Sequence, residues 1–372
     1  GVAPAEPGSR CAETLQGVGL SELGRGMLIA EPDQLMLCDC FDAEVDWLDA
    51  APEYGSDPSA VELLIGTTQF RARIAPIGSE RLTPGDSCYA RIHLDDGSGA
   101  FLPGDAFVVR GFARLESGGQ TLGGGRVLDV APPRRRRSDP ALFAGLETLA
   151  KGDLEAGTLH RVERAGFEGM TQGALQREVG LRPRACEQVL AALEKTGRIG
   201  IAGERAVSEA TLAALEERLA RSLDDFHDAE AMRPGMPRGA LRGALPGNVP
   251  RAIVDLALGR LEASGRIEAE EDLVRAHDFV PRLTQRHEAI AARIRADAMI
   301  ADLEPPSARD QAAELGLETE EHRALLAHLE RDGSLVRAPG DLWFDAGAVD
   351  KLREKVMAHL QEFGELTTVD YN

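Results

Sequence analysis

One pattern recurs three times in the second half of this 372-residue chain. Each copy is a helix-like segment that ends at a glycine and is followed by two short apolar runs with a polar turn between them. The three glycines, Gly197, Gly265 and Gly333, are spaced evenly, 68 residues apart. Glycine commonly ends helices because it enters the left-handed conformation at little cost. The even spacing and the matching flanks therefore predict a true repeat.

Each repeat has the pattern of a winged helix, which is a helix-turn-helix with a two-stranded wing. In the first copy, the helix pair before the glycine reads TQGALQREVGL and RPRACEQVLAALEKTG. The stretch 232–252 is rich in proline and glycine, which predicts a short or irregular first helix in the second copy. The predicted units are three winged helices and the start of a fourth, at 141–208, 209–281, 282–349 and 350–372.

The first third of the chain has a different pattern, with short apolar runs at close spacing. The runs at 27–30, 61–77, 87–94, 106–115 and 124–130 are typical of strands. Pro-Gly-Asp turns separate some of them, because proline and glycine favour the second and third turn positions. No room remains for helices between the runs. The pattern predicts an all-β barrel or sandwich.

This β region resembles the barrel domains of translational GTPases of the elongation factor Tu type. GVGLSELGRGMLIAEP (17–32) is similar to the end of their second domain, and LPGDAFVVRGFARLESGGQTLGGGRVLD (102–129) to the last strands of their third domain. The ending TLGGGRVLD before a proline-arginine run is most similar to SelB, the bacterial selenocysteine-specific elongation factors. The resemblance implies a multidomain β + α chain. It would contain a truncated domain II (1–33), a barrel domain III (34–131), a Pro/Arg linker (132–140) and then tandem winged helices.

The resemblance also implies a function, which is selenocysteine insertion at UGA codons. The barrel would bind selenocysteyl-tRNA, and the winged helices would link to the recoding mRNA hairpin, mainly through the fourth one. The ribosome would be a further partner, and we expect a cytoplasmic monomer. No G-x-x-x-x-G-K-[ST] loop occurs in the sequence. The GTP and Mg²⁺ of the full-length family would therefore be bound elsewhere, and we expect this fragment to have no cofactor and no enzymatic activity.

Candidate RNA-binding residues lie around the end of the predicted barrel. The net charge of −20 means that any polyanion must meet a local basic patch. Arginine suits that role because it is permanently charged and carries several donors. The run of four arginines either contacts RNA backbone or is a solvated linker, and both interpretations remain open. The predicted nucleic-acid-binding residues are Arg110, Gln120, Thr121, Arg126, Arg134, Arg135, Arg136 and Arg137.

Two other functions fit the winged helices: a DNA-binding regulator, or a protein-interaction scaffold without nucleic acid. Recognition helices are usually basic, whereas that of the third unit begins ETEEHRAL, which favours a spacer. The second unit is the best RNA candidate among the three, with arginines at 233, 238, 242 and 251. The eight histidines and five cysteines show no metal-ligand or catalytic spacing. No apolar run approaches the roughly 20 residues of a membrane span, so we expect no membrane partner.

Overall fold

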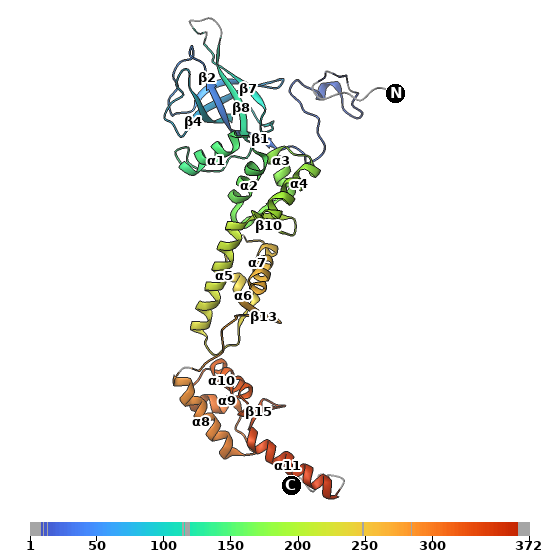
Figure 1. Ribbon diagram of the computed structural model, residues 1–372, viewed down its shortest axis with the longest axis vertical. Coiled ribbons are helices and arrows are strands. Elements are labelled where there is room, and N and C mark those ends of the chain that lie inside the picture. The colour runs from blue at the N-terminus through green and yellow to red at the C-terminus, as the bar shows by residue number, and fades with distance from the viewer. Residues whose placement is uncertain are drawn as a thin grey trace. The chain divides into compact units, whose positions relative to one another are not determined.

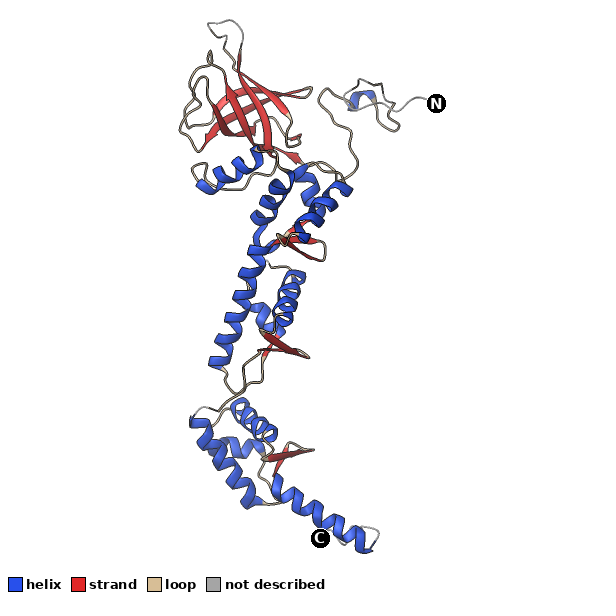
Figure 2. Ribbon diagram, in the orientation of Figure 1, coloured by secondary structure: helices blue, strands red, loops and turns tan. Residues whose placement is uncertain are grey.

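The computed structural model describes residues 9, 11–12, 14–113, 115, 120–247, 249–283 and 285–363. The chain divides into two units, Gly1–Leu212 with Pro250–Ile253, and Ala213–Val249 with Val254–Asn372. Figure 1 labels the helices and strands, and Figure 2 separates them by type. The predicted domain II segment 1–33 lies partly outside the described residues, as does the C-terminal end of the predicted fourth winged helix.

A closed six-stranded barrel forms the β part of the first unit. Its strands follow the order β2-β5-β4-β3-β7-β8, and β8 pairs with β2 to close the ring. All neighbours are antiparallel, and the interior is filled by apolar side chains such as Phe41, Leu63, Ile74 and Ile92. The short strands β1 (Leu37–Cys38) and β6 (Gly99–Ala100) pair with each other in a separate two-stranded sheet. The barrel strands are β2 (Cys40–Trp47), β3 (Ser59–Ile65), β4 (Thr68–Ile77), β5 (Ser87–Leu94), β7 (Ala106–Arg110) and β8 (Thr121–Asp129).

Three consecutive glycines allow β8 to close the barrel. A Cβ atom added to Gly125 would lie 2.0 Å from the main-chain oxygen of Glu44, and one added to Gly123 would lie 2.4 Å from that of Asp46. These distances leave no space for any side chain at either position. The close approach of β8 to β2 therefore requires glycine at both positions.

The strand predicted for residues 27–30 is wrong. After a short 3-10 helix, η1 (Leu20–Glu22), this stretch has no regular structure, and its apolar side chains are largely exposed. An apolar run becomes a stable strand only beside partner strands, and none of the described strands pairs with it. The predicted run 106–115 is also too long, because β7 ends at Arg110.

A winged helix follows the barrel within the first unit. Its core contains Leu159, Leu175, Cys186 and Leu193. Gly197 has the left-handed conformation that the sequence predicts, with φ 67°. The wing strands form a sheet in the order β10-β11-β9. The elements are α1 (Pro140–Ala150), α2 (Leu154–Ala165), η2 (Gly166–Glu168), β9 (Met170–Thr171), α3 (Gln172–Val179), α4 (Pro183–Lys195), β10 (Ile199–Ala202) and β11 (Arg205–Ser208).

Two further repeats follow, and the long helix α5 (Glu209–Ala229) leads into the first of them. Gly265 and Gly333 again have positive φ, at 70° and 78°. The helix α6 (Arg238–Gly243) has only six residues, which confirms the predicted short helix. The other elements of these repeats are β12 (Met236–Pro237), α7 (Arg251–Ala263), β13 (Ile267–Glu270), β14 (Leu273–Ala276), α8 (Gln285–Ala301), α9 (Ala308–Leu315), α10 (Thr319–Arg331), β15 (Leu335–Ala338) and β16 (Leu342–Asp345).

The last described element is α11 (Ala346–Phe363), a helix that carries a stripe of apolar residues. Leu352 and Val356 on that stripe are half-buried, and Leu360 is exposed. Within the residues that the structure describes, no helix is both long and apolar enough to cross a membrane.

Candidate nucleic-acid interface

The predicted residues at the start of the closing strand form one hydrogen-bonded group. Arg110 at the end of β7 pairs in register with Thr121 of β8. The Arg110 Nη2 atom donates to Gln120 Oε1 at 2.6 Å, and its Nη1 atom lies 3.8 Å from Glu62 Oε2. Thr121 is exposed. This group therefore presents a hydroxyl and an arginine that is partly neutralised by a carboxylate.

Arg126 has a structural role in the barrel that its sequence position does not reveal. Its Nε atom donates to Glu44 Oε2 at 2.7 Å, and its Nη2 atom donates to the main-chain oxygen of Ala150, at the end of α1, at 2.6 Å. The side chain thus joins β8 and β2 to the first helix. An RNA phosphate would have to compete with both of these partners.

The four linker arginines differ in their environments. Arg137 is half-buried, and its Nη1 atom donates to the main-chain oxygens of Ser56 at 2.7 Å and Pro76 at 3.3 Å. The main-chain N–H of Gly78 donates to the Arg137 oxygen at 3.0 Å, so the linker is fixed to the barrel. Arg135 is exposed and pairs with Asp139 at 3.0 Å.

Arg134 and Arg136 are the exposed arginines of the run that have no carboxylate within ion-pair distance among the described residues. They lie near the end of β8, whereas Arg110 and Thr121 lie at its start. With a rise of about 3.4 Å per residue, β8 is about 27 Å long, and the two groups lie toward its opposite ends. The eight predicted residues therefore form two separate groups, with Arg126 between them.

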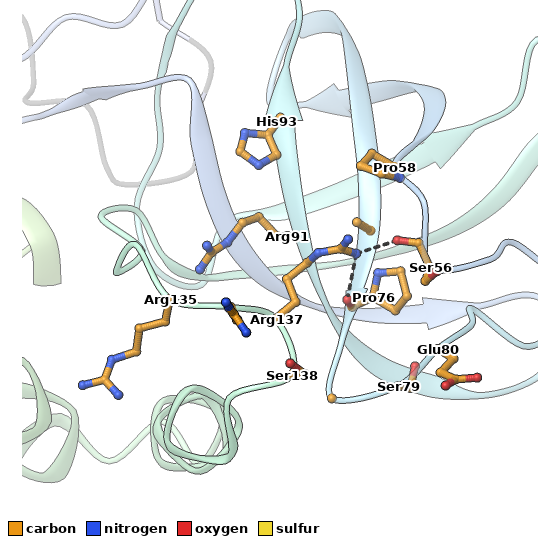
Figure 3. Close-up of a pocket in the computed structure, with 13 residues that line it drawn as sticks. Ser56, Pro58, Pro76, Ser79, Glu80, Arg91, His93, Arg135, Arg137 and Ser138 are labelled. Carbon is orange, nitrogen blue, oxygen red and sulfur yellow. Dashed lines mark hydrogen bonds between the residues drawn. The ribbon is translucent and has the colours of Figure 1, made fainter.

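A cavity of about 780 Å³ opens between the linker and the barrel wall. We call it the linker cavity. Figure 3 shows Arg137 reaching toward Ser56 and Pro76, His93 farther along the barrel wall beyond Arg91, and Arg135 directed away. Among the described residues that line it, Glu80 is the one carboxylate. The linker cavity is lined by Ser56, Pro58, Ala75, Pro76, Gly78, Ser79, Glu80, Arg91, His93, Arg135, Arg136, Arg137 and Ser138.

The positive charge in this cavity comes from the linker, because the barrel's own basic groups are neutralised. Arg91 holds the buried Asp42 through two hydrogen bonds, of 2.7 and 2.8 Å. Burial raises the pKa of Asp42, and the hydrogen bonds from Arg91 oppose that rise. Partial burial and the charges of Arg91 and Arg73 lower the pKa of His93, so its imidazole is neutral at pH 7. The uncompensated charges are those of Arg136 and Arg137.

Buried ions attach the first winged helix to the barrel. Arg164 of α2 pairs with Asp129, at the end of β8, and its Nη2 atom donates to Glu178 Oε2 of α3 at 2.8 Å. Arg161 beside it is buried and donates to the main-chain oxygen of Leu128 at 3.1 Å. These contacts fix the helices on the closing strand. Nothing in the sequence indicates these contacts except the position of Asp129 at the end of that strand.

The turn between α3 and α4 also packs against the barrel. Gly180 in this turn has φ 74°, and a Cβ atom added to it would lie 2.9 Å from Leu102 Cδ2. In a DNA-binding helix-turn-helix, the residues after this turn read base edges. Here Leu102 of the barrel contacts the turn, while Gly180 and Arg182, at the start of α4, remain exposed.

In the later repeats, arginines are paired with carboxylates or the surface is negatively charged. In the second repeat, Arg233 lies 3.4 Å from Glu230 and Arg242 lies 2.8 Å from Asp255, so these arginines have local partners. In the third, the start of α10 contributes glutamates to a cavity of about 370 Å³ that also contains Asp228 and Glu230. Such a cavity repels phosphates. In the described part of the chain, no group of three or more His, Cys, Asp or Glu side chains could hold a metal ion.

Comparison with known proteins agrees with this architecture. Residues 220–275 match the family model described as elongation factor SelB, winged helix. A selenocysteine-specific elongation factor from Desulfomicrobium baculatum is 23% identical over 373 residues, covering 99% of this chain. The chain is thus similar to SelB elongation factors, and we call it the SelB-like chain. The corresponding factor of Escherichia coli (strain K12) is 23% identical over 251 residues, covering 68% of the SelB-like chain.

A solved structure shows the same fold over most of the SelB-like chain. The crystal structure of a bacterial selenocysteine-specific elongation factor, EF-Sec, matches with a TM-score of 0.51 and 14% identity, covering 93% of this chain and 50% of that one. The SelB-like chain spans 57% and 39% of the lengths of the two curated relatives. Its closed barrel and winged helix are the fold class that the sequence predicted.

Proposed function

We propose that this SelB-like chain is the part of a cytoplasmic elongation factor that holds selenocysteyl-tRNA and links it to a recoding mRNA hairpin and the ribosome. The observation that carries the proposal is the alignment with a selenocysteine-specific elongation factor over 99% of the chain, together with the closed barrel and the repeats. In this proposal GTP and Mg²⁺ act on a GTPase domain of the full-length factors. The chain itself is a monomer, is no enzyme and needs no cofactor.

Within this proposal, the barrel unit contacts the tRNA backbone through its exposed groups. Arg134 and Arg136 have the charge and exposure for phosphate contacts, and Thr121 offers a hydroxyl at the start of β8. Arg126 and Arg137 contribute mainly by holding α1 and the linker in place. The winged helices act mainly as a connection in this proposal, because Arg233 and Arg242 of the second repeat have carboxylate partners.

The alternative of a DNA-binding regulator has less support. In the first repeat, Leu102 of the barrel packs against the turn before the recognition helix. In the third repeat, the recognition helix begins with glutamates that repel phosphates.

The proposal is tested by measuring binding of labelled selenocysteine tRNA to the whole chain by fluorescence anisotropy as the salt concentration is raised. We expect binding at low salt with a negative slope of log affinity against log salt. The double variant Arg134→Ser/Arg136→Ser should reduce that slope by about 1.5, since each phosphate contact contributes about 0.7–0.9.

The matched control for that test is Arg323→Ser/Arg353→Ser, which removes the same charge from exposed arginines of the second unit. Its slope should equal that of the unchanged chain. Failure of the chain to bind tRNA at low salt would refute the proposed function. Equal slopes for the two double variants would refute the role of the linker arginines.

A further inference from the structure

We propose that the linker cavity binds one unpaired nucleotide of an RNA strand, with its phosphate on the linker arginines and its base against the barrel wall. The inference rests on the proposed function, because it specifies which part of an RNA the barrel unit holds. It goes further by naming a single-stranded element, such as a bulged or terminal nucleotide, as the ligand.

The size of the cavity favours a nucleotide over a small anion. Its volume of about 780 Å³ lies within the range of roughly 300–1,000 Å³ that is typical of pockets for small organic ligands. A bare phosphate would fill only a small part of this space and would leave the barrel wall without contacts. A base-paired nucleotide could not enter, because its base remains in the stack.

The phosphate end of the cavity is set by Arg137 and Arg136. The main-chain oxygens of Ser56 and Pro76 hold one terminal nitrogen of Arg137, which fixes the direction of the guanidinium without neutralising it. A guanidinium has five N–H donors, so further donors remain for a phosphate. Arg136 is exposed at the rim of the same cavity, and no carboxylate pairs with either arginine in the described part of the chain.

The rest of the wall suits a base and a ribose. Pro58 supplies exposed apolar surface beside the buried Ala75 and Pro76. The neutral imidazole of His93 offers a ring face and its Nδ1 atom, while its Nε2 atom lies 3.7 Å from Cys40 Sγ. Bases that are unstacked from a strand are commonly held on rings in this way. Hydroxyl groups of Ser79 and Ser138 lie on the same lining and can pair with ribose or base edges.

The binding experiment uses nucleoside 5′-monophosphates with the whole chain, followed by calorimetry. Inorganic phosphate and a short blunt RNA duplex are the comparison ligands. We expect a monophosphate to bind about tenfold or more tightly than inorganic phosphate, because contact with the base adds to contact with the phosphate. Equal affinity of phosphate and monophosphates, or no binding of either, would overturn the inference.

Two arginine variants make the test specific. Arg136→Ser should weaken monophosphate binding about tenfold, because Arg136 lines the cavity. Arg323→Ser removes the same charge from an exposed arginine outside that lining and should leave the affinity unchanged. Equal losses in both variants would show a diffuse charge effect and overturn the inference.

A third variant tests the barrel wall. His93→Ala should weaken monophosphate binding and leave phosphate binding unchanged; equal effects on both ligands would refute contact of the base with this wall. Undiminished tRNA binding by a chain that fails these nucleotide tests would refute the nucleotide site and leave the proposed function standing. Nucleotide binding without tRNA binding would refute the proposed function and leave the nucleotide site standing.

Discussion

Replacing Arg164 by methionine should loosen the first winged helix from the barrel. Arg164 joins two carboxylates from different parts of the unit, Asp129 at the end of β8 and Glu178 in α3. The Asp129 residue is 1% exposed, so water cannot take the place of the lost guanidinium. Methionine keeps most of the side-chain volume. The variant therefore tests the charge and its hydrogen bonds more than the packing.

The expected loss of folding stability follows from the burial of the two carboxylates. Removing one partner from a buried ion pair typically destabilises a protein by about 3–5 kcal/mol, because the remaining charge stays buried without a partner. For a unit of about 200 residues, each kcal/mol lowers the midpoint of thermal unfolding by about 2–4 °C. We therefore expect the barrel unit to melt about 6–20 °C earlier in Arg164→Met.

The loss of folding stability in Arg164→Met should depend on pH. Burial raises the pKa of Glu178 even with Arg164 present. A carboxyl whose folded pKa lies above its unfolded pKa contributes stability that is present at low pH and is lost as the pH rises through the folded pKa. Without Arg164 this pKa rises further. The difference in stability between Arg164→Met and the unchanged chain should therefore shrink as the pH falls from 7 toward 4.

The assay is urea unfolding followed by tryptophan fluorescence. Trp47 lies in the barrel core, and Trp343 belongs to the third repeat, so a Trp343→Phe background reports the barrel unit alone. Arg81→Met is the control, because its pair with Glu53 lies in the same unit, is exposed and should contribute less than about 1 kcal/mol. A loss below about 1 kcal/mol in Arg164→Met, or a deficit that does not shrink at low pH, would refute the reasoning.

Two further predictions concern the closing strand and the thiols. Gly125→Ala should destabilise the barrel by about 4 kcal/mol or prevent its folding, because the Cβ atom would meet a main-chain oxygen at 2.0 Å. The control is Gly55→Ala, because Gly55 has open space around it. Similar urea midpoints for the two variants would contradict the predicted clash. At pH 8 a thiol reagent should label the exposed Cys11 well before Cys40, because burial raises the pKa of Cys40 to about 12 and leaves it protonated. Mass spectrometry of the labelled chain reads the order, and faster labelling of Cys40 would show that its thiol is not protected.

Local signals in the sequence predicted most of the repeated elements. Gly197, Gly265 and Gly333 end their helices with positive φ because that preference belongs to the residue itself. The stripe Leu212, Leu215, Leu219 and Leu223 on α5 is fully buried, because residues at this helical spacing share one face of the helix. Such features need no knowledge of distant parts of the chain.

Features that depend on distant partners could not be predicted in the same way. The run 27–30 has the composition of a strand but has no described partner strand, so composition alone misled. Arg126 and Arg137 were interpreted as phosphate contacts, because a sequence does not show that main-chain oxygens of Ala150 and Ser56 accept their hydrogen bonds. The ion pairs of Arg164 likewise exist only after the helices have packed on the barrel.

The most direct test of the account is hydrogen–deuterium exchange of the whole chain with and without selenocysteine tRNA. The account predicts that tRNA slows exchange in the linker 132–140 and in the adjoining barrel segments 54–58 and 76–80. It also predicts unchanged exchange in α4 and α10, the recognition helices of the first and third repeats. Protection confined to those two helices, with none in the linker, would contradict the account and would favour a protein that reads nucleic acid through its winged helices.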